Sequence, residues 1–462
     1  VITALFTCKY DLSAILAIAM AVLTLSSSFQ CTAADGQKIE CSACRQERRD
    51  AEGNLSHYHC DPIGGAFSVA VSGFSNDVPW LVFTAFHIGK AVEASGLGKR
   101  VSLRLLSLFG GSLLGVAYAI VTSEIALAAF IPSNTARGGG IIFPIVSSVI
   151  SALDLSFTSD LGAVGAFLVM SAAYANLVSS SLFITGMAGN PILAYKAGEI
   201  LGIEVGFVQW LVGTIVPGLC IAGIMPLVLY HYYAPVLAVS SLHERVKHET
   251  RELGPISAKE VGLSLVLLGC LVLWVGTPVF AIPSTVVAYT ALVTLILLDI
   301  LEWKDIANNR AAWDSFFWLA CFIVLAEQLT ALGVTHWLGE YMASHLGNAS
   351  PLMSCVALSL TYYFSTYFFS SITSHLVALA GPLLSAAGEL GCQPHLAFVL
   401  FAMFSSLAAV LTPFSTGTMA IYASLQFVPR KDWFLVGLLM TATMLAILFT
   451  VGMLWWKAIG WL

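Results

Sequence analysis

Two short polar segments carry hydroxyl, amide and basic side chains at matching positions. The first reads Ser-Asn-Thr-Ala-Arg from Ser133, and the second reads Ser-Ile-Thr-Ser-His from Ser371. A proline follows each first serine by eleven residues, at Pro144 and Pro382. Hydroxyls, amides and the free N–H groups at a helix start bind anions, because they donate hydrogen bonds at the positive end of the helix dipole. The two segments therefore predict two matched places that each bind a carboxylate.

Each of these two segments interrupts an apolar run and is called a polar break below. Two further polar breaks follow, one in each half of the chain. The segments Ile184-Thr-Gly-Met-Ala-Gly-Asn-Pro191 and Leu411-Thr-Pro-Phe-Ser-Thr-Gly417 interrupt apolar runs, and a tyrosine follows the first threonine of each by ten residues. One such segment alone is as easily explained as an ordinary loop. Matched pairs indicate an internal repeat, and unpaired backbone at membrane depth must line a cavity or be buried. We expect breaks from the two halves to meet and to hold the two carboxylates of a small diacid.

The elements that position these breaks are expected to be membrane-spanning helices. Of the 462 residues, 58% are hydrophobic and 10% are charged, with a formal net charge of −6, whereas soluble domains carry about a quarter charged residues. Apolar runs of about 20 residues recur and predict roughly ten to twelve spans, broken helices included. The sequence has no basic patch of the kind that binds nucleic acid. Its polar stretches are too short for a soluble catalytic domain. The sequence predicts an all-α polytopic membrane protein that is not an enzyme.

The repeat also predicts the organisation of the chain as an inverted-repeat transporter with broken helices. In chain order we expect a first membrane span over 1–30, a polar insertion with cysteine and histidine over 31–62, a first transport repeat over 63–235, a polar connecting segment over 236–260, linking membrane spans over 261–309 and a second transport repeat over 310–462. Binding would then occur where the two repeats meet.

Two basic side chains are matched as well. Arg137 lies four residues after Ser133, and His375 lies four residues after Ser371. We expect them to supply fixed positive charge where a cation-coupled transporter would bind sodium, which predicts exchange without a sodium requirement. The competing interpretation is that Arg137 neutralises a helix end and His375 packs in the interior. Glu124 is a candidate either to pair with Arg137 or to sense protons.

Several separated motifs resemble those of a known family. They are Pro132-Ser-Asn-Thr-Ala-Arg-Gly-Gly-Gly140, Thr185-Gly-Met-Ala-Gly-Asn-Pro191, Val216-Pro-Gly, Trp303-Lys-Asp305 and Lys431-Asp-Trp433. From about residue 72 onward, the chain resembles the divalent anion/sodium symporter family, in its branch of citrate/succinate antiporters and plastid 2-oxoglutarate/malate translocators. The resemblance implies a homodimer with two re-entrant hairpins in each chain, and an elevator-like motion of a transport domain against a fixed scaffold domain.

The resemblance also implies roles for single residues. Two groups would contact the two substrate carboxylates: Ser133, Asn134 and Thr135 for one, and Ser371 and Thr373 for the other. The loops that close the site would contribute Thr185, Gly186, Thr412 and Pro413. The segments that begin at Ser133 and Ser371 correspond to the two signatures of the family. The chain departs from the family at Ile372, where the second signature usually has an amide residue. The missing donor predicts either a changed choice of substrate or a substrate whose end at that side is neutral or apolar.

The polar insertion contains a cluster of potential metal ligands, namely Cys31, Cys41, Cys44, His57, His59 and Cys60. Such residues can bind zinc or form disulfides in an oxidising compartment, and an incidental insertion is the third interpretation. A membrane thiol oxidoreductase that uses Cys41 and Cys44 is the competing hypothesis from another class.

The function that the sequence predicts is secondary transport of di- or tricarboxylates such as 2-oxoglutarate, malate or succinate. The expected partners are a dicarboxylate, its counter-substrate and the lipid bilayer. We expect no cofactor for exchange, and a sodium ion only in the alternative of a sodium-coupled dicarboxylate symporter. The plastid inner envelope and the bacterial inner membrane are the expected locations.

Overall fold

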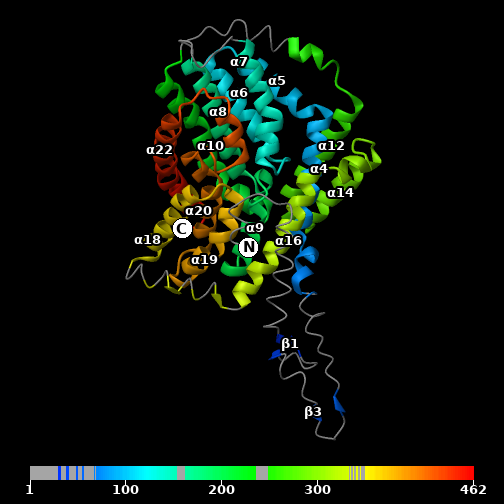
Figure 1. Cartoon of the computed structure of the whole chain (residues 1–462), viewed down its shortest axis with the longest axis vertical. Helices are drawn as coiled ribbons and strands as arrows, with labels where there is room; N and C mark the ends of the chain where they lie inside the picture. The colour runs from blue at the N-terminus through cyan, green and yellow to red at the C-terminus, as the bar shows by residue number, and fades with distance from the viewer. Residues whose placement is uncertain are drawn as a thin grey trace. The chain divides into compact units, whose positions relative to one another are not determined.

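The computed structural model describes residues 69–152, 162–235, 248–331 and 349–462, with positions 30–32, 38–40, 48, 49, 55, 56, 67, 333, 334, 337, 340, 341 and 344. These residues are nearly all helical (Figure 1), which confirms the all-α prediction. The exception is four short strands within the polar insertion. They form two antiparallel pairs, β1 (Gln30–Thr32) with β2 (Lys38–Glu40) and β3 (Arg48–Arg49) with β4 (Leu55–Ser56). The insertion residues Cys41, Cys44, His57, His59 and Cys60 lie outside the described residues.

The helices of the two halves follow one another in a similar order. The first series is η2 (Ser72–Ser75), α4 (Asp77–Ser95), α5 (Leu97–Phe109), α6 (Leu113–Ala128), η3 (Ala136–Ile142), α7 (Phe143–Ala152), α8 (Gly162–Leu182), η4 (Ile184–Gly186), α9 (Asn190–Leu201) and α10 (Phe207–Tyr233). Between the two series lie α12 (Ala258–Val275), α13 (Thr277–Phe280), α14 (Ser284–Leu297) and α15 (Trp303–Ala307). The second series is α16 (Arg310–Ala331), α18 (Pro351–Ser365), η5 (Thr366–Phe368), α19 (Ile372–Glu389), α20 (Pro394–Leu407), η6 (Ala408–Leu411), α21 (Gly417–Ala423), α22 (Arg430–Ile447), η7 (Leu448–Gly452) and α23 (Met453–Ala458). Each series thus contains a helical hairpin, then a helix broken by a short 3-10 turn, then a long helix.

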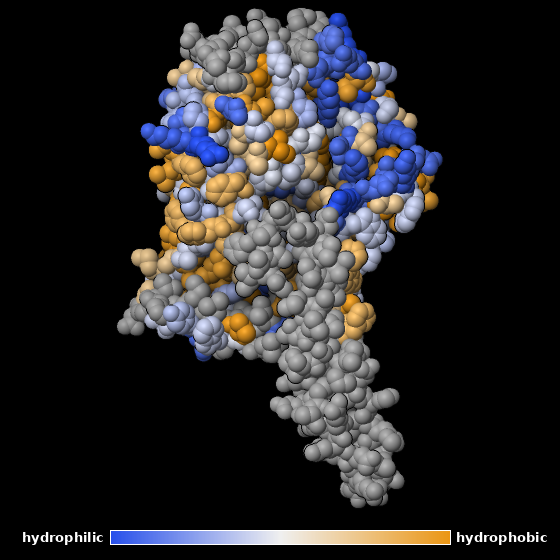
Figure 2. All heavy atoms as spheres, viewed as in Figure 1, coloured by the Kyte–Doolittle hydropathy of each residue, from blue (hydrophilic) through white to orange (hydrophobic). Residues whose placement is uncertain are grey.

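Several helices have the length and composition of membrane spans. Within the described ranges, five helical stretches of at least 18 residues are apolar enough to cross a bilayer: Gly162–Leu182, Phe207–Tyr233, Ala258–Val275, Pro394–Leu411 and Arg430–Ala458. The outer side of α12 exposes large apolar side chains, with Leu265 at 65%, Leu268 at 57% and Val272 at 56%. Figure 2 shows broad hydrophobic areas on the visible surface. Apolar surface of this extent is typical of contact with lipid.

The chain divides into two compact units. The first contains residues 1–80 and 313–334, and the second contains residues 81–312 and 335–462. In the first unit, Phe74 and Trp80 both pack against Phe316, with ring centroids 5.5 and 4.6 Å apart. In the second unit, α8 and α20 form the interior, and α6 and α10 both pack on α8. All four polar breaks belong to the second unit, so the helices of that unit position the candidate site.

Candidate functional site

The first helical hairpin consists of α6 followed by η3 and α7, and the second consists of α18 followed by α19. The two serine signatures, which begin at Ser133 and Ser371, lie at the tips of these hairpins, where a new helix starts. Ser133 follows α6 and precedes η3, and Ser371 precedes α19. The N–H three residues further on donates to each serine hydroxyl, over 3.1 Å at Ser133 and 3.3 Å at Ser371. Each serine carbonyl also accepts from the N–H four residues on, that of Arg137 at 2.9 Å and that of His375 at 3.0 Å. Both serines cap a helix N-terminus, so the symmetry of the sequence is also a symmetry of structure.

Both hairpin tips contact the same loop of the second series. Gly417 lies so close to the first tip that an added Cβ would be 3.0 Å from the hydroxyl of Thr135. At the second tip, the N–H of Ile372 donates to the carbonyl of Ser415 over 3.0 Å. The loop at residues 412–417 therefore contacts both signatures, although their first serines are 238 residues apart in the sequence (371 minus 133).

The break at residues 184–189 completes this arrangement. The hydroxyl of Thr185 donates to the carbonyl of Ala129, at the end of the first hairpin arm, over 2.8 Å. On its other side, a Cβ added to Gly189 would lie 4.0 Å from the hydroxyl of Thr373 in the second tip. All four breaks thus lie close to one another within one compact unit, and a substrate site shared between them stays a prediction.

The nine predicted site residues differ in accessibility. The side chains at the two tips are partly exposed, and these are Ser133, Asn134, Thr135, Ser371 and Thr373. By contrast, Thr185, Gly186 and Thr412 are buried, and Pro413 is partly exposed. The hydroxyl of Thr412 hydrogen-bonds with the hydroxyl of Ser415 and accepts from its N–H over 3.2 Å. The tips are therefore able to offer donors to a ligand, whereas the buried threonines hold the loops in place.

Asn134 is the tip residue with a donor to spare. Its Oδ1 accepts from the N–H of Thr135 over 3.0 Å, and its own carbonyl accepts from the side chain of Asn176 over 2.9 Å. The Nδ2 atom has no hydrogen-bond partner among the described residues. An unpaired amide at a hairpin tip suits an incoming carboxylate, because a buried donor without a partner costs free energy. The side chain of Ile372, at the matching place in the second tip, is 4% exposed and has no donor.

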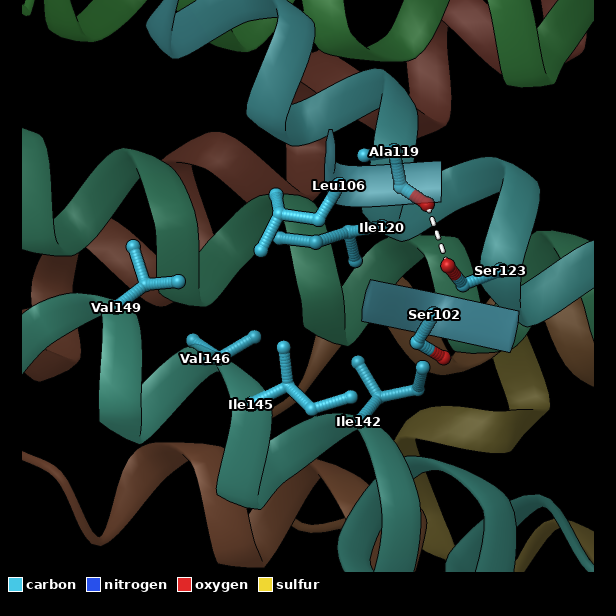
Figure 3. A pocket seen from close by; sticks show the side chains of 9 residues that line it. All are labelled: Ser102, Leu106, Ala119, Ile120, Ser123, Ile142, Ile145, Val146 and Val149. Carbon is cyan, nitrogen blue, oxygen red and sulfur yellow. Dashed lines mark hydrogen bonds between the residues drawn. The ribbon is translucent and has the colours of Figure 1, made fainter. Parts of the chain in front are cut away.

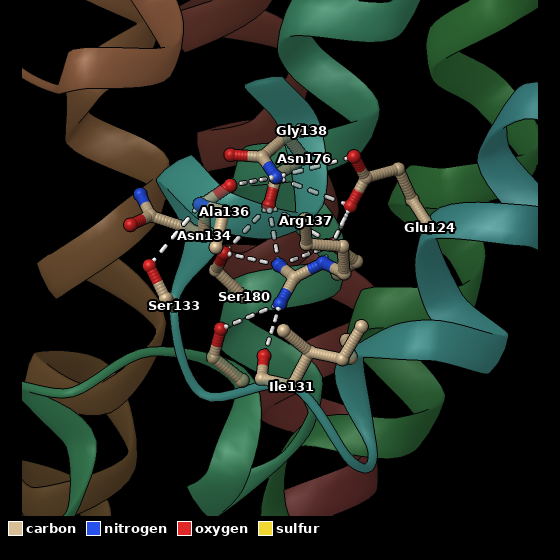
Figure 4. Close-up of polar contacts among 12 residues, drawn as sticks. Glu124, Ile131, Ser133, Asn134, Ala136, Arg137, Gly138, Asn176 and Ser180 are labelled. Atoms are coloured by element: carbon tan, nitrogen blue, oxygen red, sulfur yellow. Dashed lines mark hydrogen bonds and ion pairs between the residues drawn. The ribbon is translucent and has the colours of Figure 1, made fainter. Parts of the chain in front are cut away.

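A buried ion pair lies behind the first tip (Figure 4). Nε of Arg137 lies 2.6 Å from Oε2 of Glu124, and both side chains are fully buried. The amide of Asn176 donates to the same carboxylate oxygen over 3.1 Å, and so does the hydroxyl of Ser179. Of the two roles considered for Glu124, the structure shows pairing with Arg137. The pair has no net charge, and its positive end faces the polar breaks.

The terminal nitrogens of Arg137 bind the backbone of two different breaks. Nη1 donates to the carbonyl of Ile131 in the tip over 2.7 Å, and to the carbonyl of Gly186 in the η4 turn over 3.0 Å. Nη2 donates to the hydroxyl of Ser180 over 2.9 Å. A guanidinium can satisfy several acceptors at fixed angles, because its N–H groups form a rigid planar fork. Arg137 therefore connects the first hairpin tip to the broken helix beside it.

His375 has a different environment. Its Nε2 hydrogen-bonds with the hydroxyl of Ser365 over 2.8 Å, and its Nδ1 lies 3.3 Å from the hydroxyl of Thr366. The ring packs against Tyr362 and Phe369, with centroid distances of 4.4 and 5.0 Å. In the part of the chain that the structure describes, no carboxylate contacts this imidazole. The two matched basic residues thus have unequal surroundings, one ionic and one made of hydroxyls and aromatic rings.

The cavity beside the first hairpin is not a second anion site. It lies between α5, α6 and α7, and apolar side chains such as Leu106, Ile120 and Val146 line it (Figure 3). Its two hydroxyls are occupied, since Ser123 donates to the carbonyl of Ala119 over 2.7 Å and Ser102 to that of Gly98 over 3.0 Å. Its volume of about 10 Å³ is no more than one water molecule needs. Within the described ranges, no group of three histidine, cysteine or acidic side chains could hold a metal ion.

Comparison with known families shows where this architecture belongs. The family model described as the sodium:sulfate symporter transmembrane region matches residues 2–462. The chain belongs to this family. It is the family of divalent anion/sodium symporters, so the resemblance seen in the motifs is confirmed.

Named members of the family align over most of the chain. Dicarboxylate transporter 1 from chloroplasts of Spinacia oleracea is 34% identical over 402 residues, which cover 85% of this chain and 70% of that protein. The L-tartrate/succinate antiporter of Escherichia coli strain K12 is 34% identical over 394 residues, which cover 84% and 80%. The crystal structure of the Alcanivorax borkumensis YdaH transporter covers 98% of both chains with a TM-score of 0.56 at 13% identity, and so shares the fold. The protein is an integral membrane transporter, and the oxidoreductase hypothesis is set aside.

In this member of the divalent anion/sodium symporter family, the structure adds three polar residues of α8 to the surroundings of the site that the motifs did not reveal. Asn176, Ser179 and Ser180 all contact the Arg137–Glu124 pair. Their spacing of three and four residues places them on one side of a helix. Polar residues at that spacing, within a helix that is otherwise apolar, were the signal that could have found them.

Proposed function

We propose that this transporter exchanges di- or tricarboxylates across its membrane without a sodium requirement. The relatives named as a dicarboxylate transporter and as a tartrate/succinate antiporter support the substrate class. The partly exposed donors at two capped helix starts support it independently, because such positions suit carboxylates. In this proposal Ser133, Asn134 and Thr135 hold one carboxylate, and Ser371 and Thr373 hold the other. The substrate is a short diacid such as 2-oxoglutarate, malate or succinate.

The contacts of the Arg137 guanidinium carry the proposal of sodium independence. In transporters with broken helices, backbone carbonyls of the unwound segments commonly coordinate the coupling ion. Here Nη1 of Arg137 already donates to two such carbonyls, those of Ile131 and Gly186. A cation that needs the same oxygen atoms would have to displace a buried guanidinium. His375 takes the matching position in the second hairpin and binds hydroxyls there.

Membership of the family supports the remaining parts of the proposal. The transporter acts as a homodimer, and an elevator-like motion of a transport domain against a scaffold domain carries the two re-entrant hairpins and their substrate across. The membrane is the plastid inner envelope or a bacterial inner membrane. The sodium-coupled symporter remains the alternative against which the proposal is tested.

Counter-exchange in proteoliposomes tests the proposal directly. Vesicles loaded with unlabelled succinate, 2-oxoglutarate or no diacid are placed in labelled succinate, with either sodium or choline as the outer cation. We expect uptake only into vesicles that contain a diacid, at the same rate with both cations. Uptake that rises steeply with sodium and ignores the internal diacid would establish the symporter instead. Counter-exchange of a wider set of labelled acids then defines the substrate.

A further inference from the structure

A second hollow in the second unit is a groove of about 290 Å³ between helices α4, α5, α6 and α12. Its lining is almost entirely apolar. The one polar lining residue is Ser264, whose hydroxyl already donates to the carbonyl of Glu260 over 2.7 Å. The groove therefore has no free donor or acceptor for an anion or for water. Its principal lining residues are Val101, Leu127, Phe130, Leu267 and Leu268.

One side of this groove faces the lipid. Leu268 lines the groove and is itself 57% exposed, and on the same helix Leu265 and Val272 are exposed to a similar degree. A side chain that lines a hollow and also lies on the lipid-facing surface marks an opening toward the acyl chains. An open apolar groove at membrane depth is expected to be filled by hydrocarbon, because water is excluded there.

The groove ends at a layer of charged residues. One helical turn before Ser264, Glu260 forms a buried ion pair with Arg100 of α5, with Nε and Oε1 2.6 Å apart. The guanidinium of Arg100 also donates to the carbonyl of Gly254 over 3.0 Å. Such a layer is typical of the boundary between the hydrocarbon and the headgroups. The groove thus extends from this boundary to Phe130, beside the tip of the first hairpin.

The boundary also has a positive charge that the protein leaves unpaired. Arg104 follows Val101 by three residues and Leu97 by seven, so helical spacing places all three on the same side of α5. Arg104 is exposed and has no ion-pair partner among the described residues. Beyond it, Leu108 at the end of the helix is 75% exposed. A short helix that presents arginine and exposed leucine is suited to the membrane surface, where arginine attracts anionic headgroups.

We propose that the groove between α4, α5, α6 and α12 binds one acyl chain of an anionic glycerophospholipid whose phosphate pairs with Arg104. The groove supplies apolar contact for the chain, and Arg104 supplies the selectivity for a charged headgroup. This lipid would contact Leu127 and Phe130, at the end of the first hairpin arm. The site is separate from the carboxylate-binding tips, and the proposal does not depend on which substrate the transporter carries.

Binding of defined lipids to the delipidated, detergent-purified transporter tests this proposal. Native mass spectrometry is used to titrate dioleoyl phosphatidylglycerol and dioleoyl phosphatidylcholine, which share their acyl chains and differ in headgroup charge. Leu268→Trp fills the groove, and Leu265→Trp places the same ring on the same exposed side of α12, outside the groove lining. Arg104→Gln removes the proposed headgroup partner, and Lys259→Gln removes an exposed charge of α12. Size-exclusion profiles and thermal unfolding establish that each variant is folded.

We expect the unmodified protein to bind phosphatidylglycerol more tightly than phosphatidylcholine. Arg104→Gln should weaken binding of phosphatidylglycerol by roughly fivefold and bring it close to that of phosphatidylcholine, while Lys259→Gln keeps the preference. Leu268→Trp should weaken binding of both lipids, and Leu265→Trp should not. Equal binding of the two lipids by the unmodified protein would overturn the headgroup assignment. Equal effects of the two tryptophan variants would mean a general lipid belt and would overturn the groove.

Discussion

The carboxylate of Glu124 holds the Nε atom of Arg137 at 2.6 Å, and neither side chain is exposed. Taking two charges out of water costs several kcal/mol for each ion, which their attraction offsets only when hydrogen bonds satisfy the remaining donors and acceptors. Here they do so, because Asn176, Ser179 and Ser180 complete the pair. The pair is therefore much more costly to break than to replace as a whole.

Arg137→Gln should lower the free energy of unfolding by about 3–5 kcal/mol, because it leaves Glu124 charged and buried without its partner. The double variant Glu124→Gln/Arg137→Gln should be clearly more stable than the single one. Chemical unfolding in detergent, followed by tryptophan fluorescence, measures both. If the double variant is no more stable than Arg137→Gln, the two side chains are not coupled as described.

Replacing the tip serines should affect substrate binding, whereas replacing the serines at the hairpin bases should not. Ser133→Ala and Ser371→Ala each remove a hydroxyl that we assign to a carboxylate, and a hydrogen bond to a charged group contributes about 1.5–3 kcal/mol. We expect the KM of exchange to rise about tenfold or more. Ser112 and Ser350 provide matched controls, since each caps the first arm of a hairpin in the same way. Equal rises in KM for tip and base variants would show that helix capping alone explains the effect.

Asn134→Ala and Ile372→Ala should have different consequences although the two residues are matched in sequence. Removal of the unpaired Nδ2 of Asn134 should raise the KM of exchange about tenfold with little loss of stability. Ile372 is buried, so its truncation should lower the free energy of unfolding by about 2–5 kcal/mol. Transport kinetics and thermal unfolding of the same two preparations separate these effects. A large rise in KM for Ile372→Ala at unchanged stability would contradict this division of roles.

Two glycines of the Gly-Gly-Gly segment should differ sharply in tolerance. A Cβ at Gly138 would lie 2.5 Å from Cγ2 of Thr418 and 2.8 Å from Nδ2 of Asn176, whereas a Cβ at Gly140 would have no neighbour closer than 3.9 Å. Gly138→Ala should therefore cost about 1–3 kcal/mol of stability and disturb the amide that binds Glu124. Gly140→Ala should be neutral or stabilising in a helix. Thermal unfolding of the two variants is the measurement, and equal melting temperatures would contradict the packing described.

Much of the fold could be predicted from the sequence, because membrane spans and repeats leave simple patterns. The apolar runs indicated the helices, and the matched spacing after Ser133 and Ser371 indicated two similar tips. The contacts through Gly417 and Ser415, which join those tips, had no sequence signal of their own. They depend on how α20 and α21 fold back, which is a property of packing and not of local residue type.

The sequence indicated which residue types form the candidate site better than it indicated what each side chain does there. A hydroxyl in a sequence does not show whether the backbone already uses it, and the hydroxyl of Thr185 donates to the carbonyl of Ala129. Similarly, Glu124 had two equally good roles until its distance from Arg137 was known. Asn176 escaped notice because a single amide in an apolar helix resembles an ordinary interior residue.

An arginine cannot dissociate into the compartment on either side of a membrane, and sodium can. The carbonyls of Ile131 and Gly186 accept hydrogen bonds from the guanidinium of Arg137, which is covalently part of the chain. An electrochemical gradient of sodium therefore has no means of doing work through these two oxygen atoms. In the exchanger that we propose, the gradients of the two exchanged metabolites alone set the direction of net movement.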